Sequence, residues 1–153
     1  MNRQLHDTNA DDYEVLTTRV LPWPRELVFK AWTDPLHLAK WWGPNGFTNT
    51  FHEFEPRPGG TWRFVMHGPD GTDYHNQIVF VEVAQPERIV FDHLLPMHKF
   101  RVTATFDDHG GNTLIAFRMR FESVAQCDAV KSFVVEANEQ NLDRLETELA
   151  NMT

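Results

Sequence analysis

The sequence has a single cysteine, no long apolar run and no cluster of basic residues, and each shortage excludes a class of protein. Because Cys127 has no second cysteine to pair with, an internal disulfide is impossible, and the chain suits a reducing compartment. No stretch reaches the ~20 apolar residues of a membrane-spanning helix. The polar first residues also lack the apolar segment of a signal peptide. We therefore expect a cytoplasmic protein with no membrane span.

Positive charge is also scarce, with 14 Lys and Arg against 22 Asp and Glu and a formal net charge of −8. An acidic surface repels phosphate groups, so neither nucleic acid nor an anionic membrane is expected as a partner. The 153 residues are enough for one domain with its own core. We expect a flexible lead-in over residues 1–12 and a single domain over residues 13–151.

Seven segments have the alternating, β-branched or aromatic pattern of strands, and short turns separate most of them. The short links predict an antiparallel sheet, because parallel strands need long crossovers. The predicted strands are Tyr13–Val20, Thr50–Glu55, Thr61–His67, Tyr74–Val83, Arg88–Leu95, Phe100–Asp107 and Thr113–Phe121.

Two short helices and one long helix are predicted around these strands. Arg25–Thr33 has helical spacing of apolar residues, and Asp34 followed by Pro35 is typical of a new helix start, which the pair Gly43-Pro44 then ends. Ser123 and Gln126 have the spacing of a capping box ahead of a long amphipathic segment. We predict an α+β fold, in which a curved antiparallel sheet wraps a long C-terminal helix and two short helices follow the first strand.

Four stretches, "VFKAWTDPLHLAKWWGP", "EFEPRPGGTWRF", "VFVEVAQPERIVF" and "NLDRLETELA", carry a family resemblance. The sequence resembles the activator of Hsp90 ATPase homologue-like family of the START-like superfamily, also called SRPBCC, helix-grip or Bet v 1-like. The resemblance implies the same fold. It leaves the function open, because the superfamily includes lipid carriers, hormone receptors, cyclases and co-chaperones.

A sheet curved around one helix cannot close as tightly as a sandwich, so we expect a cavity between them that suits an apolar ligand. Five aromatic residues lie on the strand faces and helix stripe that should converge there: Trp62, Phe64, Phe91, Phe117 and Phe133.

Trp32, Trp41 and Trp42 have two interpretations, since a buried tryptophan stabilises a core by itself and an exposed one can stack on a ligand. Adjacent helical residues point about 100° apart, so Trp41 and Trp42 should face different surroundings. We predict that Trp42 packs in the core and that Trp41 forms the rim of the cavity. The alternative is that all three only seal the end of the sheet.

Polar residues on apolar strand faces often line a cavity, which makes His75 and His93 candidates for ligand contact, although partly exposed strand residues would look the same. The eight histidines form no His-x-x-x-His pair, and none has metal-ligand spacing to Cys or paired acids, so we expect no metal and no other cofactor. Many members of the resembling family have Gly-Trp where this chain has Ala137-Asn138. Asn138 therefore either makes the cavity roomier and more polar or turns toward solvent.

No nucleophile motif or phosphate-binding loop is present, and Cys127 has no neighbouring base, so no catalytic residues are assigned. The predicted function is the binding of a small hydrophobic or amphipathic molecule without demonstrated catalysis. Three alternatives remain open: a co-chaperone-type or regulatory protein-binding domain, a cyclase- or hydrolase-like enzyme using cavity histidines, and a purely structural domain with a filled interior. A protein partner is an option, and the oligomeric state is left open, with a homodimer among the choices.

Overall fold

The computed structural model describes residues 13–95 and 99–153. The lead-in expected over residues 1–12 lies outside this range. In the described residues, seven strands form one antiparallel sheet in the order β1-β7-β6-β5-β4-β3-β2. The strands are β1 (Glu14–Leu21), β2 (Thr48–Phe54), β3 (Thr61–His67), β4 (Asp73–Ala84), β5 (Arg88–Leu95), β6 (Phe100–His109) and β7 (Asn112–Phe121).

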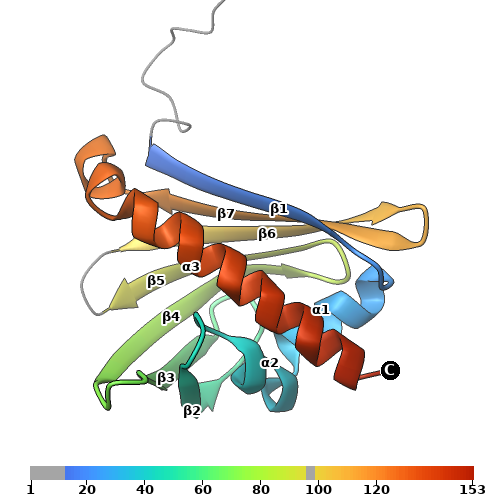
Figure 1. Cartoon of the computed structure of the whole chain (residues 1–153), viewed down its shortest axis with the longest axis horizontal. Coiled ribbons are helices and arrows are strands. Elements are labelled where there is room, and N and C mark those ends of the chain that lie inside the picture. Colours follow the sequence, from blue (N-terminus) through green and yellow to red (C-terminus); the bar gives the residue numbers. More distant parts are fainter. Residues whose placement is uncertain (1–12, 96–98) are drawn as a thin grey trace, which may run out of the picture.

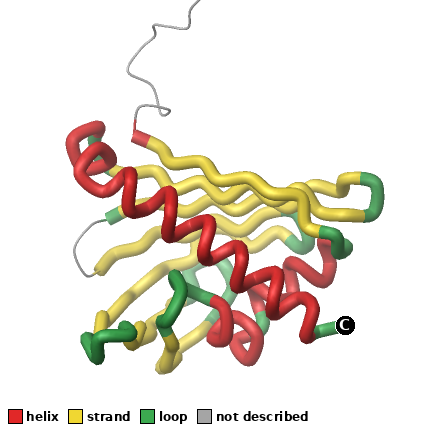
Figure 2. The backbone as a smooth tube through the Cα atoms, in the orientation of Figure 1, coloured by secondary structure: helices red, strands yellow, loops and turns green. Residues whose placement is uncertain are grey.

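Three helices accompany the sheet in the described part of the chain: α1 (Arg25–Thr33), α2 (Pro35–Trp41) and α3 (Val124–Asn151). The long helix α3 runs diagonally across one face of the sheet, and α1 and α2 lie near its C-terminal half (Figure 1). The tube view shows the strands curving behind this helix (Figure 2). The predicted fold class is confirmed, and the predicted strand limits differ from the observed ones by at most two residues.

The helix ends follow the local chemistry that the sequence predicts. Asp34 ends α1 and caps α2, where its Oδ1 accepts a hydrogen bond of 3.0 Å from the Leu36 N–H, and Pro35 occupies the first turn. Ser123 caps α3 by accepting from the Gln126 N–H at 3.1 Å. These caps satisfy backbone donors that have no partner inside a helix. None of the three helices is long and apolar enough to cross a bilayer.

An ion-pair cluster attaches α3 to the edge strand β1. The Arg19 guanidinium contacts Glu139 at 2.6 Å, Asp143 at 2.8 Å and Glu146 at 2.9 Å. Hydrogen bonds to these three carboxylates raise the pKa of Arg19, although burial, the largest single effect, acts in the opposite direction. The cluster therefore fixes the helix over the sheet.

Candidate functional site: a cavity beneath α3

A cavity of about 360 Å³ lies between α3 and the sheet. One wall comes from α3, with Val130, Phe133, Val134, Ala137, Asn138 and Asn141. The opposite wall comes from the sheet, with Met66, Asn76, His93, Phe100, Val102, Phe117, Met119 and Phe121. The turn after α2 closes one side with Trp42, Gly43 and Pro44.

Strand alternation explains why β7 contributes apolar groups to this cavity. Phe117, Met119 and Phe121 are buried on the face toward α3. Arg118 and Arg120 lie between them in sequence and therefore point to the other face. There, Arg118 approaches Glu14 at 3.7 Å, while the Arg120 guanidinium lies over the Tyr13 ring at 5.3 Å. The alternation thus keeps both cations away from the cavity, as the sequence predicts.

Two polar lining residues, Asn76 and His93, are joined by a hydrogen bond. Asn76 Nδ2 donates to the Tyr74 carbonyl at 2.9 Å, which leaves its Oδ1 to accept from His93 Nε2 at 2.8 Å. This arrangement assigns a proton to His93 Nε2, because an amide oxygen can only accept. The His93 ring also stacks on Phe100 with centroids 4.5 Å apart. The imidazole is therefore held in one orientation on the cavity wall.

The structure brings four of the nine predicted pocket residues to the cavity: His93, Phe117, Phe133 and Asn138. Phe133 is 69 % exposed and therefore lies at the mouth. Asn138 is buried, with Nδ2 donating to the Met119 sulfur at 3.3 Å. Asn138 therefore lies on the cavity wall and does not turn toward solvent.

The placement of Trp41 at the rim is wrong, whereas Trp42 packs in the core as predicted and in addition lines the cavity. Trp41 is only 1 % exposed, and its Nε1 donates to the Ala31 carbonyl at 2.9 Å within the packing of α1 against α2. Trp42 is 8 % exposed and lines the cavity. The physical reason is that Trp42 follows the last helical residue with an extended backbone, φ −67° and ψ 131°. The helical phase used for the prediction does not apply to it.

Trp62, Phe64 and Phe91 also lie outside the cavity, in the core next to Trp42. The Trp62 and Phe64 rings stack with centroids 4.4 Å apart, and Trp62 meets Phe91 at 5.7 Å and Trp42 at 5.3 Å. Alternation places these residues on the inner face as expected. The alternation pattern cannot show that the rings of these residues fill the space at this end of the sheet.

His75 is the fifth predicted residue that the cavity lacks. Asn76, Ile78 and Phe80 are buried in β4, so His75 points to the opposite face, where it is exposed. Asn76 was missed, although it lies two residues before Ile78 and the alternation could have found it. Asn141 was not predicted as a site residue, because most of the other residues on the same face of α3 are apolar and indicate a helix face that packs in the core.

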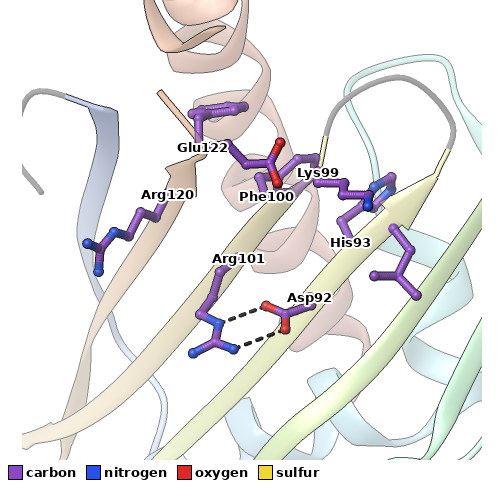
Figure 3. Close-up of a pocket in the computed structure, with 9 residues that line it drawn as sticks. Asp92, His93, Lys99, Phe100, Arg101, Arg120 and Glu122 are labelled. Atoms are coloured by element: carbon purple, nitrogen blue, oxygen red, sulfur yellow. Dashed lines mark hydrogen bonds and ion pairs between the residues drawn. The ribbon is translucent and has the colours of Figure 1, made fainter. Parts of the chain in front are cut away.

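A second depression, shown in Figure 3, is lined by residues from β5, β6 and β7 and the positions next to β6 and β7. Asp92 and Arg101 form a two-point ion pair on it, with distances of 2.7 and 3.0 Å. Lys99, Arg120 and Glu122 add further charges. This charged hollow differs from the apolar cavity beneath α3, and His93 borders both.

A hydrogen-bonded chain of Thr50, His67 and Asp73 crosses strands β2, β3 and β4. Thr50 Oγ1 lies 2.7 Å from His67 Nε2, and His67 Nδ1 lies 2.8 Å from Asp73 Oδ1. The order of groups is that of a nucleophile, a base and an orienting acid. However, the chain is exposed, and none of its members lines either cavity described above. The arrangement provides no enclosed place for a substrate.

Two other chemical features concern the histidines and the cysteine. Within residues 13–95 and 99–153, no group of three or more His, Cys, Asp or Glu side chains is placed to hold a metal ion. Cys127 is buried, and burial raises the pKa of its thiol. A protonated, buried thiol is a poor nucleophile.

A curved antiparallel sheet around one long helix is the helix-grip architecture. Solved structures share it. A protein from Arthrobacter aurescens is 22% identical, with 95% of this chain and 90% of that chain covered and a TM-score of 0.86. A protein from Nitrosomonas europaea is 20% identical, with 92% and 96% covered and a TM-score of 0.84. The AHSA1 protein from Silicibacter pomeroyi is 20% identical, with 92% and 99% covered and a TM-score of 0.75.

Residues 22–150 match the family described as Activator of Hsp90 ATPase homolog 1-like protein, and the chain belongs to that family. The resemblance seen in the sequence is therefore confirmed. A comparison with curated proteins gave no match. The three solved structures named above are less than 25% identical to this chain, so they establish its fold and leave its ligand to be argued from the cavity.

Proposed function

We propose that the protein binds a small apolar or amphipathic molecule in the cavity beneath α3. The observation that carries the proposal is the cavity itself, which has about 360 Å³ and a mostly apolar lining with a few buried polar side chains. These are the usual properties of small-molecule sites.

The lining favours binding over turnover. His93 is the sole titratable side chain among the described lining residues, and its Nε2 is engaged by Asn76. Acid–base or nucleophilic catalysis usually needs two or more positioned groups. A cyclase- or hydrolase-like enzyme would have to work with His93, since His75 lies on the outer face and an asparagine does not titrate.

A protein-binding regulatory domain is the second candidate. The family description refers to activation of the Hsp90 ATPase, and Phe133 is a large aromatic residue exposed on α3. Aromatic residues are enriched at protein–protein interfaces. An increased ATPase rate of a purified Hsp90-type chaperone on adding the protein, reduced by Phe133→Ser, would support this candidate. An unchanged rate would count against it.

The binding proposal is tested by titration with N-phenyl-1-naphthylamine, an uncharged apolar probe that fluoresces on leaving water. We expect saturable binding of one probe per chain. Asn138→Trp should abolish it, because the large ring projects from a buried position into the cavity. Glu136→Trp is the matched control, since Glu136 is exposed on α3. Equal binding by both variants would contradict the site.

A further inference from the structure

Two buried asparagines on α3 face the cavity one helical turn apart. Asn138 and Asn141 both line it, and each is 5 % exposed. Residues three apart on a helix are neighbours, with about 5–6 Å between their Cβ atoms. One small head group can therefore reach both amides.

Each amide uses one of its two ends within the protein. Asn141 Oδ1 accepts from the Gly43 N–H at 3.1 Å, and this contact defines which end is the oxygen. Asn138 Nδ2 is directed to the Met119 sulfur at 3.3 Å, a weak acceptor. Asn138 Oδ1 and Asn141 Nδ2 make no hydrogen bond to any other described residue. One unused acceptor and one unused donor thus lie side by side.

Both unused ends remain accessible, since neither atom is among the fully enclosed side-chain N and O atoms that lack a partner in the described residues. A ligand that displaces water from these atoms must replace the hydrogen bonds that the water makes. The Asn76–His93 pair in the same cavity shows the contrast, because both ends of the Asn76 amide are bonded. The unused ends on α3 therefore mark where a ligand's polar group would bind.

The cavity holds no permanently charged side chain that would balance a charged ligand. No Lys, Arg, Asp or Glu occurs among its described lining residues. Arg144 is the guanidinium next to Gly43, but it is not among the lining residues, and its donors are already used by the backbone carbonyls of Gly43, Pro44 and Phe47. A carboxylate would enter without a cation, and it could only accept hydrogen bonds, so Asn138 Oδ1 would face it as a second acceptor.

From this pair we infer that the ligand is an uncharged amphipathic molecule whose head group both donates and accepts hydrogen bonds, such as a primary amide or an alcohol. The head donates to Asn138 Oδ1 and accepts from Asn141 Nδ2, while the apolar tail lies against Phe117, Met119 and Phe121. The inference rests on the proposed function and specifies the chemical class of the ligand.

Three competitors of equal size test it by displacing N-phenyl-1-naphthylamine at neutral pH. Nonanamide donates and accepts, methyl octanoate only accepts, and nonanoate is an anion. We expect nonanamide to bind at least about tenfold more tightly than nonanoate, and several-fold more tightly than the ester, as the loss of one buried hydrogen bond implies. Equal displacement by the amide and the anion would overturn the inference while leaving apolar binding intact. No probe binding at all would overturn the proposed function as well.

Asn138→Leu provides the matched variant, because leucine has a similar shape and no acceptor. The variant should bind nonanamide about tenfold more weakly and the methyl ester with less than about a twofold change. A thermal melt of the variant checks that it is folded. If the variant does not fold, the comparison of the three competitors on the wild-type protein still tests the inference. An unchanged preference for the amide in a folded Asn138→Leu protein would refute the role of Asn138.

Discussion

Replacing Arg144 with alanine tests whether α3 holds the turn that closes the cavity. The Arg144 guanidinium donates hydrogen bonds to the backbone carbonyls of five residues at and after the end of α2: Lys40, Trp42, Gly43, Pro44 and Phe47. Burial lowers the pKa of Arg144, and no carboxylate pairs with it among the described residues. The side chain thus acts as a clamp on the end of α2 and on the following turn.

The expected loss of stability in Arg144→Ala follows from the three shortest of these hydrogen bonds. Those to Gly43, Pro44 and Phe47 measure 2.8, 2.9 and 2.9 Å, and all three are partly buried. At about 1 kcal/mol each, their loss should lower the free energy of unfolding by about 3 kcal/mol. For a chain of this size, the melting temperature should fall by about 6–12 °C. Probe affinity should fall too, because Gly43 and Pro44 line the cavity.

Thermal and denaturant unfolding of Arg144→Ala, compared with Arg118→Ala, measures the effect. Arg118 is an equivalent arginine on the outer face, where its contact with Glu14 is 3.7 Å and partly solvent-exposed. Loss of a contact of that kind should cost less than about 1 kcal/mol. If the two variants unfold at the same midpoint, the clamp does not exist and the reasoning is refuted.

Four further results are expected. Trp41→Ala should lose about 3–5 kcal/mol of stability in denaturant, since Trp41 is in the core, and a loss below 1 kcal/mol would contradict that position. Arg19→Leu should lose about 1–2 kcal/mol at low salt and less at high salt, and a salt-independent loss would refute an ionic origin. Cys127 should react with an aromatic disulfide reagent far more slowly in the native protein than in denaturant, and equal rates would show an accessible thiol. Elemental analysis of untagged protein should find no stoichiometric transition metal, and one equivalent of zinc would overturn the interpretation of the histidines.

The fold could be predicted because its signals are local. Asp34 with Pro35, and Ser123 with Gln126, specify helix starts through hydrogen bonds within a few residues. The inner face of each strand follows from alternation, as Phe117, Met119 and Phe121 show. Such patterns need no knowledge of distant parts of the chain.

The site could be predicted only in part because a cavity depends on distances between elements. Trp62 and Phe64 occupy the correct face, yet their stacked rings fill the end of the sheet that α2 covers. Trp42 reaches the cavity because the backbone becomes extended one residue after the helix ends. Sequence spacing fixes neither the space that remains beneath a helix nor the direction of a residue just outside one.

The proposed function depends on the space beneath α3 being a binding site. The most direct measurement is the titration of wild-type, Asn138→Trp and Glu136→Trp proteins with N-phenyl-1-naphthylamine. We expect saturable one-to-one binding for wild type and Glu136→Trp and none for folded Asn138→Trp. Saturable binding of equal affinity in all three proteins, or none in the wild type, would contradict the proposed site.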